Sequence, residues 1–174
     1  IAGIALSAAI AVLFIRDGTA RSGVSITRTT ILLPPNQIMN EQVTRGSGSA
    51  RHQLAVSPDG QSLVYVASTG GRSQLFIRGL AEFDAKPIPQ TDGANFPTFS
   101  PDGRWVAFFA NYRLQKVSIS GGAPISICDV PIIGRGASWG PADTIIISAG
   151  EPHGLWRVSA SGGRPEQITT ANGT

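Results

Sequence analysis

The chain has 174 residues, of which 41% are hydrophobic and 14% are charged. This length and composition suffice for the core of one ordinary domain, or of part of a larger one, and they exclude a disordered or collagen-like chain. The net charge of +3 comes from basic residues scattered singly along the sequence, so no basic run indicates a nucleic-acid-binding surface. We expect no nucleic acid among the partners.

The chain offers few ligands for metal or redox chemistry. A single cysteine, Cys128, excludes an internal disulfide, and the only two histidines, His52 and His153, lie far apart in the sequence. This pattern contains no zinc-type ligand set. We predict that Cys128 is a small buried apolar residue in a strand, and that the chain binds neither a metal nor a cofactor.

The first fifteen residues, IAGIALSAAIAVLFI, carry no charge and end at Arg16. Such a run is typical of a membrane helix, because a surface helix of a globular protein alternates apolar with polar positions. As a helix it would span about 22 Å, short of the roughly 30 Å hydrocarbon core. The chain begins with Ile and lacks the basic start of a secretory signal, so we interpret residues 1–16 as the C-terminal part of a truncated transmembrane helix, with residues 1–15 in the membrane. The alternative is a buried core helix.

Residues 17–50 are predicted to form a linker with one strand. Residues 24–33 contain β-branched residues in partial alternation and run into two prolines, which is typical of a strand, whereas residues 36–50 show little periodicity. Arginines flank the apolar run on its C-terminal side, but the positive-inside rule needs both flanks. The residues alone therefore leave the membrane orientation open.

From residue 51 the sequence repeats with a period near forty. Pro58, Pro101 and Pro141 lie 43 and 40 residues apart, and a leucine later in each period recurs at spacings of 39 and 41. Each period holds four short strand candidates separated by turn residues, which is typical of a β-propeller blade. We predict an all-β fold with three four-stranded blades, over residues 51–91, 92–130 and 131–174.

Three blades make only a partial propeller, because closed propellers need at least four. We expect the strand at residues 24–33 to supply the outer strand of a missing final blade, or to pair loosely with a neighbour. An isolated arc of blades would expose apolar faces and sheet edges to water.

The tetrapeptide Ser-Pro-Asp-Gly occurs at residues 57–60 and again at residues 100–103. Proline presets the backbone for the second position of a type I turn, aspartate suits the third, and glycine accepts a positive φ at the fourth. We interpret both copies as hairpin turns, and in the third copy we expect Asp143 to replace the glycine. Asp59 and Asp102 then serve turns and not a metal, because equivalent sites in different blades lie far apart.

Residues 136–140, Gly-Ala-Ser-Trp-Gly, match the G-x-S-x-G elbow that carries the nucleophile of α/β-hydrolases. The repeat, however, places Ser138 in an inner strand, and Pro141 follows where the helix of the elbow would begin. His52 and His153 fall at strand or loop edges without a matched partner. We therefore predict no catalytic residue, no cofactor-binding residue and no metal ligand in this chain.

Aromatic residues fall mainly at alternate, repeat-equivalent strand positions, which favours packing between blades over ligand stacking. They are Tyr65, Phe76, Trp105, Phe108, Phe109 and Trp156. Recognition is expected in loops, because the strands of a propeller are scaffold. The candidate loops are residues 81–85, 134–136 and 150–154, and the expected partner is a protein or peptide of unknown identity.

The recurring order of an inner strand, Ser-Pro-Asp-Gly, an apolar strand and a stretch such as LWRVSASGG resembles the WD-repeat-like, Tol-type propeller repeats of bacteria. More narrowly, an apolar run followed by LPP, LAVSPDG, QLFIRGL and PTFSPDGRWVAFFA looks like the C-terminal region of bacterial membrane-bound serine/threonine protein kinases. This resemblance implies a cytoplasmic kinase domain before the helix and an extracytoplasmic propeller after it. The chain has no Gly-rich loop, HRD or DFG stretch, so no kinase residue is carried over.

The resemblance implies a non-catalytic sensor or protein-interaction module of a membrane-anchored kinase. Two alternatives stay open: the N-terminal propeller of a serine peptidase of the prolyl oligopeptidase type, and a periplasmic scaffold of the Tol type. The flanking reading frame distinguishes them. A kinase domain upstream supports the first, a hydrolase downstream supports the second, and a start codon with a basic region just before Ile1 supports the third.

Overall fold

The structure is a computed structural model, and it describes Thr30, Leu33, Gln37, Ile38 and residues 53–130, 135–149 and 153–170. Two compact units divide the chain at Thr30, and every described strand belongs to the second. The expected transmembrane helix lies outside the described residues. So does most of the predicted strand at residues 24–33, of which the described Thr30 and Leu33 belong to no strand. Among the described residues, no helix is long and apolar enough to span a bilayer.

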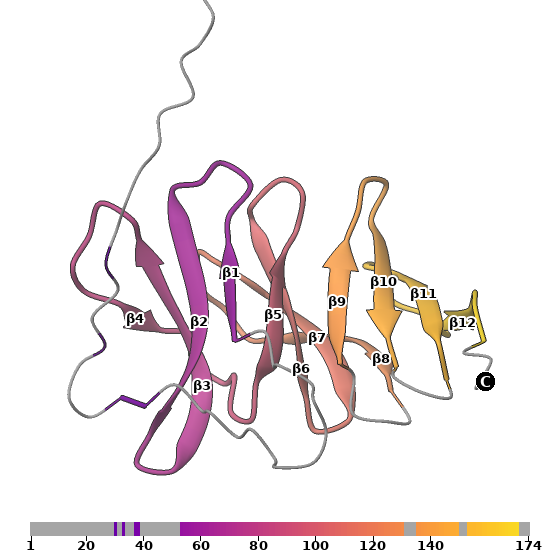
Figure 1. Cartoon of the computed structure of the whole chain (residues 1–174), viewed down its shortest axis with the longest axis horizontal. Coiled ribbons are helices and arrows are strands. Elements are labelled where there is room, and N and C mark those ends of the chain that lie inside the picture. Colours follow the sequence, from indigo (N-terminus) through magenta and orange to yellow (C-terminus); the bar gives the residue numbers. More distant parts are fainter. Residues whose placement is uncertain are drawn as a thin grey trace, which may run out of the picture. The chain divides into compact units, whose positions relative to one another are not determined.

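Three antiparallel sheets of four strands, here called blades 1, 2 and 3, stand side by side (Figure 1). Blade 1 contains β1 (Leu54–Val56), β2 (Ser62–Thr69), β3 (Arg72–Gly79) and β4 (Lys86–Pro87). Blade 2 contains β5 (Asn95–Phe99), β6 (Trp105–Ala110), β7 (Arg113–Ser118) and β8 (Ile125–Asp129). Blade 3 contains β9 (Gly136–Trp139), β10 (Thr144–Ser148), β11 (Leu155–Ser159) and β12 (Glu166–Gln167). Strands pair in chain order within each blade, which confirms the predicted all-β fold of three four-stranded units.

The second strand of each blade is apolar along its length because both of its faces are covered. In β2, Val64 and Val66 pack toward blade 2, whereas Leu63 and Tyr65 pack on the opposite face of the sheet. In β6, all residues after Trp105 are buried. A strand that is buried on both faces has a continuous apolar sequence and not an alternating one.

The core lies between the blades. Phe108 is fully buried among side chains of blades 1 and 2, and Phe109 packs among side chains of blades 2 and 3. The predicted packing of aromatic residues between blades is therefore confirmed for these two residues. Tyr65 and Phe76 stack on each other at 5.6 Å on the far face of blade 1, where Leu33 also packs.

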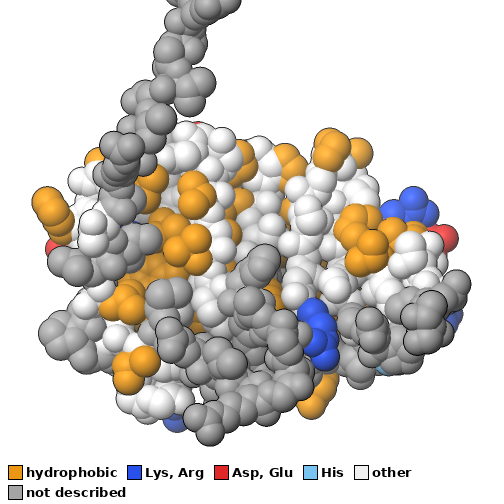
Figure 2. Space-filling model, viewed as in Figure 1, with side chains coloured by type: hydrophobic (Ala, Val, Ile, Leu, Met, Phe, Trp, Pro, Cys, Tyr) orange, Lys and Arg blue, Asp and Glu red, His pale blue; other side chains and the backbone are white. Residues whose placement is uncertain are grey.

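Residues at equivalent positions differ in exposure on the outermost blade face. Leu75 and Leu114 are 0% exposed, whereas Leu155, at the same register in blade 3, is 39% exposed. The first two leucines face a following blade, and Leu155 faces none within the described residues. Hydrophobic side chains accordingly reach the surface over blade 3, and also over blade 1, in Figure 2.

The hairpin of blade 1 is longer than that of blade 2. Ala67 pairs with Gln74, as Ala110 pairs with Arg113, but two further residue pairs follow in blade 1 before the chain turns. At this extension Ser68 also forms an isolated antiparallel bridge with Ile38. The hairpin projects at the lower end of Figure 1.

Candidate functional site

The two Ser-Pro-Asp-Gly segments are hairpin turns, as predicted. The Gly60 N–H donates to the Ser57 carbonyl at 2.8 Å, and the Gly103 N–H donates to the Ser100 carbonyl at 2.9 Å. Both glycines have positive φ, 68° and 70°. These turns join the first and second strands at the upper end of the blades in Figure 1, which we call the turn end.

Side chains of the same segments reinforce the turns. In blade 2, Ser100 Oγ donates to Asp102 Oδ1 at 2.6 Å and accepts the Trp105 N–H at 2.9 Å. Asp102 also accepts the Arg104 N–H, at 3.1 Å, and Arg104 Nε, at 2.6 Å. The hydrogen bond from Ser100, followed by those from Arg104, lowers the pKa of Asp102 to about 2. In blade 1 Asp59 accepts the equivalent hydrogen bonds from Ser57 Oγ and the Gln61 N–H, so both aspartates serve the turns.

The third turn differs from the prediction. Asp143 has the expected positive φ, 53°, but Ala142 before it is also positive, at 55°. The turn is one residue shorter as well: the Gly140 N–H donates to Thr144, four residues on, whereas the Ser100 N–H donates to Trp105, five residues on. Two successive positive φ values define a tight type I′ turn, which lacks the serine–aspartate pair of the others.

The first two turns lie close together, whereas the second and third flank a cavity. A β-carbon on Gly103 would lie 3.6 Å from Pro58 of blade 1. Between blades 2 and 3 there is instead an open cavity of about 250 Å³. We call it the interblade cavity; it is lined by Ser100, Pro101, Asp102, Arg104, Trp105, Lys116, Trp139, Gly140, Pro141, Ala142 and Asp143.

The interblade cavity is lined by two aromatic side chains, Trp105 and Trp139, and by the cation of Lys116. Lys116 Nζ lies 5.0 Å from the centroid of the Trp105 ring, a cation–π contact across β6 and β7. Trp139 is only 8% exposed, and its indole Nε1 has no hydrogen-bond acceptor among the described residues. Sequence reasoning treated Trp105 as a packing residue and did not single out Lys116 or Trp139 for binding. The pairing of β6 with β7, which sets Lys116 beside Trp105, is not visible in a single strand.

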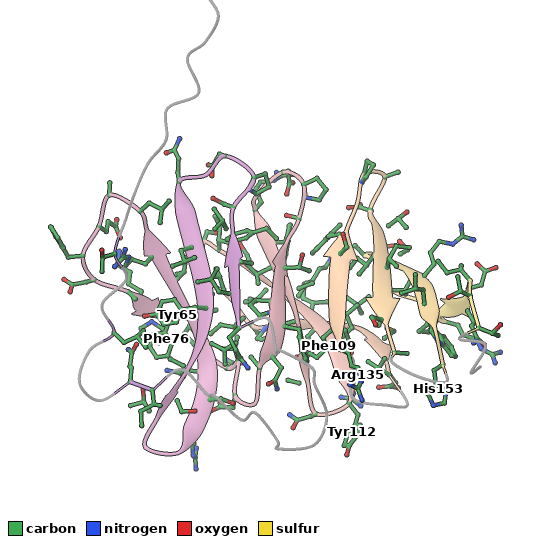
Figure 3. All side chains as sticks on the ribbon, viewed as in Figure 1. Tyr65, Phe76, Phe109, Tyr112, Arg135 and His153 are labelled. Atoms are coloured by element: carbon green, nitrogen blue, oxygen red, sulfur yellow. The ribbon has the colours of Figure 1, made fainter. Side chains whose placement is uncertain are left out.

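The opposite end of the blades carries a second group of exposed side chains. Tyr112, Arg135 and His153 lie at the lower end of the sheets in Figure 3, away from the three turns. Tyr112 is 66% exposed and occupies the β6–β7 hairpin with a positive φ of 59°. The candidate loops at residues 134–136 and 150–154 reach this end, although residues 134 and 150–152 lie outside the described residues.

The third candidate loop, residues 81–85, lies at the turn end and not with the other two. Its Phe83 is 95% exposed, which sequence reasoning missed. The sequence signal for this exposure is the polar, charged surroundings of a single aromatic residue between β3 and β4.

The residues considered for catalysis that the structure describes lie in strands or take part in hydrogen bonds that hold the fold. Ser138 is exposed in the inner strand β9, opposite Ile146 of β10, as the repeat predicts. The His153 carbonyl accepts the Trp156 Nε1–H at 2.9 Å, while His52 lies outside the described residues. Cys128 is buried in β8, as predicted, and burial, assisted by the charge of Asp129, raises its pKa to about 11. Within the described ranges, no group of three His, Cys, Asp or Glu side chains is placed to hold a metal.

Comparison with protein-family models and with the sequences of curated proteins found no match. Among solved structures, the chain is similar to a TolB-type protein of Agrobacterium tumefaciens, with a TM-score of 0.56 and 20% identity over 66% of this chain and 47% of that one. Kuenenia stuttgartiensis hydrazine synthase has a TM-score of 0.56 and 14% identity over 74% of this chain and 40% of that one. A prolyl endopeptidase structure has a TM-score of 0.50 and 11% identity, over 71% of this chain and 22% of that one.

These likenesses define the class of protein by its fold. The chain is a set of adjacent β-propeller blades, and it spans less than half the length of each of these structures. The propeller fold that the repeats predicted is supported by these structures.

Proposed function

We propose that this chain is a non-catalytic propeller module that binds a protein or peptide, and that it acts as the sensor of a membrane-anchored bacterial serine/threonine kinase. The proposal rests on a difference between side chains that hold the turns and side chains that are exposed at the ends of the blades. Serine and aspartate of the repeat are engaged in the turns, as Ser100 and Asp102 are, whereas exposed aromatic side chains lie at the two ends of the blades, Phe83 at the turn end and Tyr112 at the other. In a propeller, the ends and not the strands are free to meet a partner.

The kinase context is supported by the resemblance of the repeats and of the preceding apolar run. Residues 1–15 would anchor the protein in the membrane, and the propeller would lie on the extracytoplasmic side. Partner binding would then be communicated through the helix to a kinase domain on the other side.

A second candidate function is favoured by the likeness to a prolyl endopeptidase structure. In that case the blades would belong to the propeller of a serine peptidase. A periplasmic scaffold is the third candidate, and the likeness to a TolB-type protein favours it.

The complete reading frame and an activity assay test the proposal. If a kinase domain precedes the chain, membrane vesicles containing the complete protein are assayed for autophosphorylation, with residues 53–170 present or deleted. We expect the deletion to change the rate while the kinase domain retains activity. A hydrolase domain that follows the chain, and whose peptidase activity changes on the same deletion, contradicts the sensor role.

The non-catalytic part of the proposal has a separate test at Ser138. The chain is incubated with a fluorophosphonate, which labels activated serines. We expect no labelling above that of the Ser138→Ala variant, because Ser138 sits in a strand whose partner is Ile146. Stoichiometric labelling that Ser138→Ala abolishes would show a nucleophile.

A further inference from the structure

The interblade cavity lies at a junction that departs from the repeat. Strand register makes Trp105 equivalent to Ser62 of blade 1, since each pairs with the last residue of its third strand. By the same register Lys116 is equivalent to Ile77, which packs into the core between blades 1 and 2. Blade packing is thus achieved at the first junction without a tryptophan or a charge. Departures from a repeat that packing does not require are candidates for function.

Lys116 carries a charge that its neighbours do not balance. Arg157, at the same register in blade 3, pairs with Glu166 on the adjacent strand at 2.7 Å. The residue opposite Lys116 on the adjacent strand is Ile125, and Lys116 forms no ion pair within the described part of the chain. Its ammonium lies over the Trp105 ring, and this contact leaves it able to meet an anion.

None of the other charged groups of the cavity forms an ion pair with Lys116 in the described part of the chain. Both oxygens of Asp102 are engaged, Oδ1 by Ser100 Oγ and the Arg104 N–H, and Oδ2 by Arg104 Nε. Asp143, on the opposite wall, is the remaining carboxylate of the lining. Arg104 is paired with Asp102, so the lining carries no net charge, and Lys116 is its one cation without an ion pair among the described residues.

We propose that the interblade cavity binds a carboxylate of a partner polypeptide, with the carboxylate on Lys116 and its apolar stem against Trp105 and Trp139. This inference rests on the proposed binding function and names the chemistry of the partner. The carboxylate comes from an acidic side chain or from a chain terminus, since both present the same group. Trp139 Nε1 is shielded from solvent, so the carboxylate is assigned to Lys116 and not to the indole.

The three tryptophans of the chain provide a direct readout. Trp105 and Trp139 line the cavity, whereas Trp156 does not, so its indole resonance is an internal control. The full chain, labelled with ¹⁵N, is titrated with three peptides. Acetyl-Gly-Glu-Gly-amide carries only a side-chain carboxylate, acetyl-Gly-Gly-Ala carries only a terminal carboxylate, and acetyl-Gly-Gln-Gly-amide carries neither.

We expect one or both carboxylate peptides to shift the Trp105 and Trp139 indole resonances saturably, and the glutamine peptide to leave them unchanged. Lys116→Met keeps the apolar stem and removes the charge, so it should weaken binding by about tenfold or more. Asp143→Asn removes the opposing carboxylate and should strengthen binding several-fold. Arg157→Met, at the equivalent position of blade 3 and outside the cavity, should have no effect.

Three results would overturn the inference: no saturable shift with either carboxylate peptide up to about 10 mM, equal binding of the glutamine peptide, or undiminished binding by a folded Lys116→Met variant. If that variant does not fold, the affinity of the Asp143→Asn variant is the test, and an affinity that does not rise would overturn the inference. These outcomes are separate from the test of the proposed function. A hydrolase in the flanking frame would contradict the sensor role and leave the cavity result unaffected, whereas a responsive kinase with no carboxylate binding would direct attention to Tyr112 and the opposite end.

Discussion

Ser100 shows how one buried hydroxyl holds a hairpin turn. Its Oγ accepts the N–H of Trp105, the first residue of β6. Ser100→Ala leaves this backbone donor without an acceptor, so we expect the free energy of unfolding to fall by about 1–3 kcal/mol in urea denaturation. Ser120→Ala, at an exposed serine, is the control, with an expected change within about 0.5 kcal/mol. Equal losses in the two variants would contradict the role of Ser100.

Asp102 should add a small pH dependence to the stability. Its pKa is lowered from 3.8 to about 2 in the folded chain, so its ionised form is the one that folding favours. The stabilisation is complete above the unfolded pKa, near 4, and is lost as the pH falls through 2. We expect Asp102→Asn to flatten the fall in the free energy of unfolding between about pH 4 and 2, measured by denaturant titrations. Because the group is exposed, the effect is a fraction of the ideal linkage value. An unchanged acid profile would show that Asp102 does not contribute.

At the residue scale, the sequence predicted the features that depend only on consecutive residues, such as the hairpin turns. Pro101, Asp102 and Gly103 are consecutive, and their turn chemistry does not depend on the rest of the fold. The contact of Lys116 with Trp105 depends instead on how β6 and β7 pair. Its role was therefore missed, although both residues were visible.

Gly154, where the chain enters β11, tests the fit between two segments of blade 3. Its φ is 67°, and a β-carbon there would lie 2.2 Å from the Thr169 carbonyl oxygen. Gly154→Ala must therefore displace backbone, and we expect a loss of about 3 kcal/mol or more in the free energy of unfolding, measured by urea denaturation. Gly70→Ala is the matched control, because Gly70 has a similar φ of 58° and open space around it.

The control should lose only the cost of placing alanine at a positive φ, about 1 kcal/mol. Similar losses at Gly70 and Gly154 would mean that the backbone near Thr169 relaxes readily. The comparison thus separates strain in one residue from a clash between two segments.

The boundaries of the strands were predicted well where the repeat is regular. They were predicted less well where a hairpin or a turn is longer or shorter than its equivalent in another blade. Spacings of 43 and 40 residues gave the three blades, but they did not locate the length changes. Blade 1 has two additional residue pairs in its hairpin, and the third turn is shorter by one residue. Alignment on Pro141 placed Asp143 at the glycine position, although strand register makes the turn a different type. The interblade cavity beside that turn could therefore not be foreseen.

At the scale of the whole molecule, the exposed fraction of the leucine at one strand position shows whether the next blade covers that face of the sheet. Leu114 is 0% exposed between blades 2 and 3, and Leu155 is 39% exposed on the outer face of blade 3. We expect Leu114→Ala to cost about 2–5 kcal/mol in the free energy of unfolding and Leu155→Ala less than half as much, measured in urea. The two variants serve as controls for each other, since the substitution and the strand position are the same. An equally large loss at Leu155 would mean that its side chain is covered in solution, for instance by association of two chains.

The long hairpin of blade 1 also shapes the surface that a partner would meet at the lower end of the blades. Two additional residues in each strand, at about 3.4 Å per residue, raise the tip of β2 and β3 by roughly 7 Å above the hairpin of blade 2. That end is consequently stepped and not level, because the β6–β7 hairpin that carries Tyr112 ends before the tip of the β2–β3 hairpin. A flat protein surface would contact only the tip of the β2–β3 hairpin, whereas a narrow extended segment could lie alongside that hairpin.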